Sequence, residues 1–131
     1  MATNATPTAS SPPANVRRGD IYWVSPAEAR GAIPNVAHPH VVLQDDVFNR
    51  SRVHTVIVCA LTSNLNRANE PGNVLLEVGE GNLPLQSVLV VSQVSSVART
   101  ELGPYIGALS SQRVEQVLDG MRFQQASFFN R

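Results

Sequence analysis

The sequence contains one cysteine, Cys59, and no lysine in 131 residues. A single thiol cannot close an internal disulfide, so the fold has to be held by a hydrophobic core. No apolar run approaches the roughly 20 residues that a membrane-spanning helix needs. The sequence therefore argues against a disulfide-stabilised secreted domain and against a membrane protein with spanning helices. We expect a cytoplasmic protein without membrane attachment.

Charge is also scarce. Charged residues make up 15% of the chain, and ten basic residues, all of them arginine, balance ten acidic ones. A neutral chain is poorly suited to coating nucleic acid through bulk charge, so any phosphate-binding surface has to be a local cluster. Arginine suits such a cluster because its planar guanidinium matches the oxygens of phosphate and carboxylate.

The remaining composition is that of one folded domain. Hydrophobic residues make up 43% of the chain, and this length can bury a core without metal or disulfide support. Residues 1–16 carry no charge and are rich in proline, alanine, serine and threonine, which indicates a disordered tail. We therefore expect a tail over residues 1–16 and one domain over residues 17–131.

Short β-branched segments dominate this domain. They predict strands at residues 21–24, 40–44, 54–62, 73–79, 87–97 and 105–109. The segment 54–62 is apolar enough to be buried on both faces, and residues 45–51 form a turn or a single helical turn. Residues 25–39 form a long loop, a kind of segment that is usually functional in a compact domain.

From Ser110 onward the pattern becomes helical. Val114, Val117, Leu118 and Met121 recur at helical spacing, and we assign them with Phe123 to the core. Ser110 or Ser111 is a natural N-cap, and Gly120 weakens the helix without ending it. The order of elements predicts a mainly β fold of the α+β type. In this fold a small, strongly bent sheet or barrel carries a C-terminal helix.

Two of the three histidines stand together in the stretch HPH at residues 38–40. Two histidines at i and i+2 on a strand can chelate a metal, but a closed site needs four ligands and no further ligand spacing is present. We therefore expect neither a metal nor another cofactor. Imidazole can serve as acid and base near neutral pH, so a catalytic role remains open beside that of a solvated strand entrance.

Segments in a fixed order resemble the MazF/PemK toxins of bacterial toxin–antitoxin systems. They are RRGDIYWV, VVLQDDVFNRS, TVIVCALTSNL, PGNVLLEVGEGNLPLQSVLVVSQ and LGPYIGALS, and they cover residues 17 to about 125. The resemblance implies an SH3-like barrel of the CcdB/MazF type with a C-terminal helix, and a homodimer. It also implies metal-independent, sequence-specific cleavage of single-stranded RNA such as mRNA, and a cognate antitoxin whose acidic C-terminal segment blocks the RNA groove.

The same resemblance points to site residues. The family's threonine at the end of the third strand falls on Thr62, with Ser63 as a neighbouring hydroxyl. The arginine that the family usually keeps before a proline falls on His38, and the loop glutamate falls on Ile33. Four arginines on loops expected to flank the site are candidates for RNA binding: Arg30, Arg50, Arg52 and Arg67.

These departures leave alternatives open. The first is an endoribonuclease that cuts RNA by 2′-hydroxyl attack, with Thr62 and His38 as catalytic residues. The second is a catalytically impaired family member that only binds an antitoxin or RNA. A gyrase-poisoning toxin of the same fold is disfavoured, because the matching segments are those of the ribonuclease branch.

Overall fold

The computed structural model describes residues 15–25 and 37–126. Most of the predicted tail, together with Arg30 and Ile33, lies outside these ranges. Val16, which we had assigned to the tail, is buried and packs with Tyr22 and Val24, so it belongs to the folded domain. No helix within the described ranges is long and apolar enough to cross a membrane.

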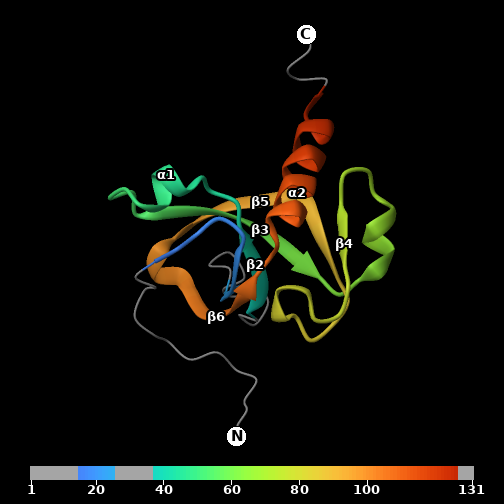
Figure 1. The fold of residues 1–131 in the computed structure, drawn as a ribbon, viewed down its shortest axis with the longest axis horizontal. Coiled ribbons are helices and arrows are strands. Elements are labelled where there is room, and N and C mark those ends of the chain that lie inside the picture. The colour runs from blue at the N-terminus through green and yellow to red at the C-terminus, as the bar shows by residue number, and fades with distance from the viewer. Residues whose placement is uncertain (1–14, 26–36, 127–131) are drawn as a thin grey trace, which may run out of the picture.

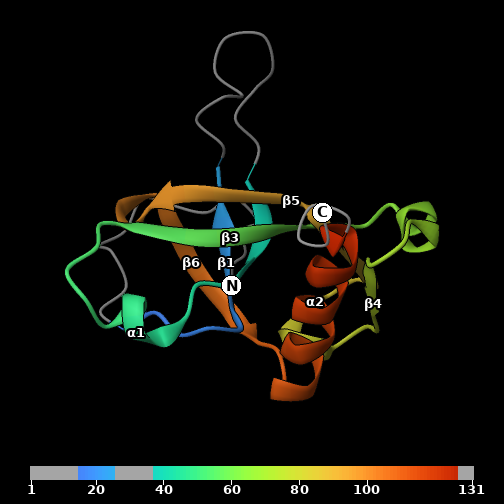
Figure 2. The same cartoon turned by 90° about the horizontal axis from the view of Figure 1, so that it is seen from above.

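Six strands form one antiparallel sheet in the order β4-β5-β3-β2-β1-β6 (Figure 1). Their bounds are β1 Asp20–Val24, β2 His38–Val42, β3 Thr55–Thr62, β4 Val74–Leu76, β5 Ser87–Ala98 and β6 Leu102–Ala108. Helix α1 spans Asp46–Asn49 and helix α2 spans Ser111–Gln124, and three 3-10 segments are η2 Leu65–Asn69, η3 Glu80–Asn82 and η4 Arg99–Glu101. Figures 1 and 2 place α1 at one end of the sheet and α2 with β4 at the other.

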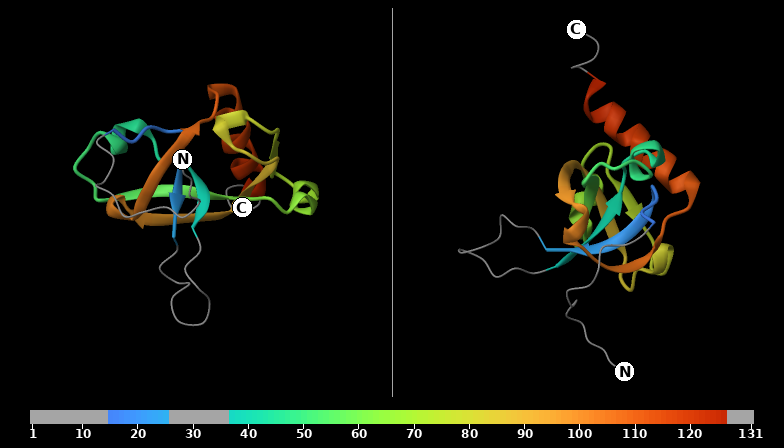
Figure 3. Two further views of the ribbon diagram at one scale, coloured as in Figure 1. Left: turned by 90° about the horizontal axis from the view of Figure 1, so that it is seen from below. Right: turned by 90° about the vertical axis from the view of Figure 1, so that its left-hand side faces the viewer.

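The sheet curls strongly, and β6 crosses β3 and β5 at an angle (Figure 3). Segment η3, which follows the edge strand β4, packs against the opposite edge strand β6. There the Asn82 side chain donates a hydrogen bond to the Ile106 carbonyl at 2.9 Å. This hydrogen bond links the segment after one edge strand to the opposite edge strand, as the curl of the sheet allows. The predicted mainly β fold with a C-terminal helix is confirmed.

Neighbouring residues of one strand enter different core clusters. Ile21 and Val41 join the core cluster under α2, whereas Tyr22 and Val42 join a second cluster on the other face. Successive strand side chains point to opposite faces, which explains this separation. Apolar residues at consecutive positions are therefore buried on both sides of β1 and β2.

Helix α2 begins as predicted. The Ser110 hydroxyl accepts a hydrogen bond from the Arg113 backbone N–H, which caps the helix N-terminus. Val114 and Val117 are buried. The placement of Phe123 in the core is wrong, because its side chain is 65% exposed. Phe123 lies nine residues after Val114, which at about 3.6 residues per turn puts it on the opposite side of the helix.

Other strand predictions needed adjustment. Strand β2 begins at His38, two residues before the predicted start, and β4 covers only Val74–Leu76. Strand β3 is buried on both faces over much of its length, because Val56 and Val58 are buried on one face and Cys59 and Leu61 on the other. Ile57 departs from the prediction, since its side chain is 41% exposed. Ile57 shares its face with Cys59 and Leu61, but the core cluster that α2 covers contains only those two.

Gly120 lies at a close packing contact, which its low helix propensity does not indicate. A Cβ at this position would collide with the carbonyl oxygen of Gly72, in the turn before β4, and lie 3.0 Å from the carbonyl carbon. Gly72 itself adopts a φ of +87°, which favours glycine. The two backbones therefore touch, and this contact seats α2 beside β4.

We expect Gly120→Ala to lower the free energy of unfolding by about 1–3 kcal/mol, as overpacking does. In a helix without this contact the same change would stabilise by about 1 kcal/mol. Denaturant unfolding of the variant measures the sign directly. Glu115→Ala, at an exposed position of the same helix, is the control and should stay within about 0.5 kcal/mol of the parent. A stabilised Gly120→Ala protein would show that α2 is not held by this backbone contact.

Candidate functional site

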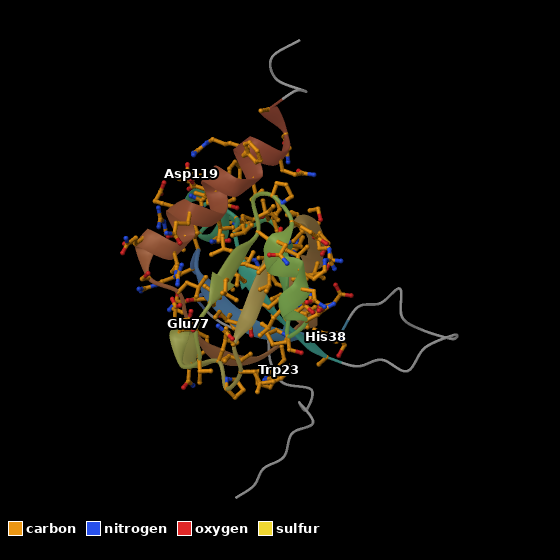
Figure 4. The ribbon with its side chains drawn as sticks, turned by 90° about the vertical axis from the view of Figure 1, so that its right-hand side faces the viewer. Trp23, His38, Glu77 and Asp119 are labelled. Atoms are coloured by element: carbon orange, nitrogen blue, oxygen red, sulfur yellow. The ribbon has the colours of Figure 1, made fainter. Side chains whose placement is uncertain are left out.

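Two hollows lie side by side where β2 begins and β3 ends. The larger has a volume of about 430 Å³ and the smaller of about 200 Å³. His38, Leu61 and Thr62 line both. The larger hollow also has polar residues on its wall, His40, Arg67 and Gln93, whereas the smaller is walled mainly by Trp23, Pro39, Leu83, Pro84 and Leu85. Figure 4 shows Trp23 and His38 close together on this side of the molecule.

Strand pairing brings His38 and Thr62 together. His40 of β2 pairs with Ala60 of β3 in antiparallel register. His38 lies two residues before His40, and Thr62 lies two residues after Ala60. Since the side chains of a strand alternate, all four project from the same face of the sheet. The two positions that the family resemblance singled out thus meet in one place.

The larger hollow exists because β5 is irregular. Cys59 pairs with Val94 and Leu61 pairs with Leu89, so the single residue Ala60 faces the four residues 90–93 of β5. Bulges of this kind redirect side chains and are common beside active sites. Gln93 is exposed at this bulge and lines the hollow.

Segment η2 supplies the cation of the larger hollow. Arg67 lines it and donates from Nε to Glu70 at 2.6 Å, a half-exposed ion pair of small net strength. The Asn73 side chain donates to the Arg67 carbonyl at 2.9 Å and accepts from the Val91 backbone N–H at 3.0 Å. Asn73 therefore links the segment that carries Arg67 to β5, a role that the sequence pattern did not predict.

The hydroxyl of Thr62 is oriented by the chain that follows it. Its Oγ1 accepts a hydrogen bond from the Asn64 backbone N–H at 3.1 Å, and Asn64 in turn caps η2. Since that bond uses an oxygen lone pair, the hydroxyl proton remains for donation into the hollows. The neighbouring Ser63 is exposed and lines only the smaller hollow.

His40 is buried in the floor of the larger hollow, and His38 is exposed at its rim. Burial lowers the pKa of His40; the hydrogen bond of its Nδ1 to the His38 carbonyl opposes this shift, and the charge of His38 reinforces it.

Strand β2 begins at His38. Pro39 precedes the residues of β2 that pair with β3, so its missing N–H interrupts no ladder between those strands.

The other predicted arginines are not brought to these hollows. Arg52 lies before β3. That strand has eight residues, and at a rise of about 3.3 Å per residue its two ends are roughly 23 Å apart. Arg50 lines a separate hollow of about 290 Å³ with Asp46. Arg30 lies outside the described residues. Of the arginines proposed for RNA that the structure describes, Arg67 is the one beside His38 and Thr62.

Further side chains have structural roles. The Nε2 of the buried Gln44 donates to Asn49 Oδ1 at 3.0 Å and to the Thr55 carbonyl at 3.1 Å. Cys59 is fully buried and donates to the Val90 carbonyl at 3.0 Å. His54, at the far end of β3, is exposed. Within residues 15–25 and 37–126, no group of three or more His, Cys, Asp or Glu side chains is arranged to hold a metal ion.

Comparison with known proteins agrees with this architecture. Residues 17–124 match the family described as PemK-like, MazF-like toxin of type II toxin-antitoxin system. Endoribonuclease MazF6 of Mycobacterium tuberculosis and Endoribonuclease MazF2 of Mycobacterium bovis are each 34% identical to this chain over 107 residues, which are 82% of this chain and 94% of each relative. The chain therefore belongs to the PemK/MazF toxin family.

Solved structures share the fold. An endoribonuclease from a mycobacterial species, in complex with its cognate antitoxin, superimposes with a TM-score of 0.68 at 18% identity, over 85% of this chain and 95% of that chain. MazF from Deinococcus radiodurans gives the same TM-score at 16% identity, over 86% of this chain and 97% of that chain. At these identities the likeness concerns the fold alone.

Cys59 should be inert in the native protein. Burial raises the pKa of its thiol from 9.0 to about 12, which lowers the thiolate fraction near neutral pH about a thousandfold. We expect a chromogenic disulfide reagent to label the native protein far more slowly than the denatured protein, which should release one equivalent of chromophore. Equal labelling rates would contradict the burial of this side chain.

Proposed function

We propose that this protein is a toxin-type endoribonuclease that cleaves single-stranded RNA sequence-specifically and without a metal ion, by attack of the RNA 2′-hydroxyl. The observation that carries the proposal is the pair of hollows that share His38 and Thr62. The family membership and the relatives named endoribonucleases at 34% identity support it.

The reaction needs a base for the 2′-hydroxyl, an acid for the leaving 5′-oxygen and donors for the charged phosphorane. Thr62 offers a hydroxyl proton at the boundary of the two hollows. Arg67 offers guanidinium N–H groups in the larger hollow, and phosphate outcompetes an exposed carboxylate partner such as Glu70 at little cost. These donors stabilise the negative charge that develops on the phosphate oxygens.

We assign proton transfer to His38. An arginine at this position would remain charged and stabilise the phosphorane, whereas an imidazole can give a proton to the leaving 5′-oxygen. His38 is exposed at the rim shared by both hollows, so a phosphate lying across the Thr62 hydroxyl is within reach of its ring. In this assignment the histidine replaces the family's arginine by a different chemistry.

The smaller hollow suits the base of an adjacent nucleotide. Its walls are apolar and include the half-buried ring of Trp23. Bases of single-stranded RNA stack on aromatic side chains when they are turned away from their neighbours. The RNA would then cross the boundary formed by His38 and Thr62, with its phosphate on the polar side and a base on the apolar side.

The proposal includes a homodimer that a cognate antitoxin neutralises. Solved structures of the same fold include a mycobacterial endoribonuclease with its cognate antitoxin and a MazE–MazF complex from Deinococcus radiodurans. An antitoxin segment that lies over the two hollows would exclude RNA from them directly.

We expect the purified protein to cut a labelled single-stranded RNA in the presence of a chelator, leaving a cyclic phosphate and a 5′-hydroxyl. His38→Ala and Thr62→Val should each lower the cleavage rate by about 10²-fold or more, because each removes a group that acts on the reacting phosphate. Gel analysis of cleavage time courses measures these rates. His54→Ala, which removes an exposed imidazole at the far end of β3, is the matched control and should retain the parent rate.

The outcomes separate the alternatives. A wild-type protein that binds RNA or antitoxin but cuts no RNA at any concentration is the impaired binding module. Cleavage that survives His38→Ala unchanged would overturn the role of this histidine while leaving the endoribonuclease activity in place.

A further inference from the structure

We infer that His40 is a further catalytic residue, the general base that takes the proton from the attacking 2′-hydroxyl on its Nε2 atom. This inference rests on the function proposed above and adds a residue to it. Neither the family resemblance nor the sequence pattern gives His40 a role. The inference comes from the position of its ring in the larger hollow and from the hydrogen bond of that ring.

The hydrogen bond determines which nitrogen of the ring carries the proton. Nδ1 of His40 lies 2.9 Å from the carbonyl oxygen of His38. A carbonyl oxygen only accepts hydrogen bonds, so Nδ1 is the donor. In the neutral ring Nε2 then has no proton and presents a lone pair, which is the state that a general base requires.

The second ring nitrogen, Nε2, has no hydrogen-bond partner among the described residues. The bond from Nδ1 is the one hydrogen bond that the ring makes within the described part of the chain. No buried side-chain nitrogen or oxygen in that part lacks a partner. His40 lines the larger hollow, and the proposal places its Nε2 toward that space.

The surroundings keep the ring neutral. On β1, Tyr22 pairs directly with His40, and on β3 the paired residue is Ala60. Burial raises the pKa of Tyr22, whose hydroxyl bonds to Asp20 at 3.2 Å, so Tyr22 brings no charge. The other titratable groups lining the hollow are His38 and Arg67, and Gln93 and Ser95 of β5 add neutral polar side chains. Among the described residues, no carboxylate lines the hollow beside His40.

Two imidazoles in different environments can divide the proton transfers of RNA cleavage. Nε2 of His40 takes the proton of the 2′-hydroxyl as the O2′–phosphorus bond forms. The bond from phosphorus to O5′ breaks, and O5′ leaves with a proton from His38. The products are a 2′,3′-cyclic phosphate and a 5′-hydroxyl, and exchange with water returns His40 to neutral and reprotonates His38.

A pH profile of cleavage tests the assignment. We measure single-turnover cleavage of labelled RNA with chelator, from acidic to mildly basic pH, for the parent, His40→Gln and His54→Gln. Glutamine retains a neutral polar side chain but cannot accept a proton near neutral pH. We expect His40→Gln to lose at least about 10²-fold in rate and to lose the decline in rate on the acidic side. His54→Gln should match the parent in both respects.

Binding and tautomer measurements separate catalysis from a structural role. RNA carrying a 2′-deoxynucleotide at the cleaved position should bind His40→Gln as tightly as the parent, and thermal unfolding should show that the variant folds. Nitrogen-15 NMR of the parent should show His40 with its proton on Nδ1. A parent-like rate or acid limb in His40→Gln, an equal loss of rate and of binding, or a proton on Nε2 would overturn the inference. If the parent cuts no RNA, both the proposed function and this inference fail.

Discussion

The antiparallel pairing of β2 with β3 is the constraint on which the site depends. It places His40 opposite Ala60, and from that one register His38 and Thr62 follow onto the same sheet face. A shift of β2 by one residue against β3 would turn His38 to the opposite face from Thr62. Burial fixes this register, because Val41 and Val42 lie in different core clusters and a one-residue shift would remove each from its cluster.

The curled sheet then surrounds this pair with unlike walls. The irregular pairing of β5 opens the polar hollow and exposes Gln93 there. On the other side, Leu83 and its neighbouring residues after η3 close an apolar hollow against Trp23. A polar and an apolar surface on either side of one threonine suit a polymer that alternates phosphates with flat bases. The site is thus a product of strand pairing and sheet curvature together.

Much of this fold could be predicted from the sequence. β-branched segments located all six strands, and helical spacing with Ser110 located α2, because such patterns reflect backbone geometry and burial. Predictions failed where burial depends on distant partners. Phe123 and Ile57 look like core residues in one dimension, yet both side chains are exposed in the folded chain. Gly120 looked like a defect in a helix, and its close contact with Gly72 was invisible at a separation of 48 residues (120 − 72).

The sequence by itself determined the strand and helix segments, the family and the pair His38 and Thr62, because periodicity and motif order are local properties of the chain. Only the tertiary structure decided that Arg67 joins this pair while Arg50 and Arg52 lie beyond the other end of β3. It also buried His40 and bonded its Nδ1 to a carbonyl. Distance along a strand and the partners of a ring nitrogen are set by how the chain packs, so a linear pattern cannot contain them.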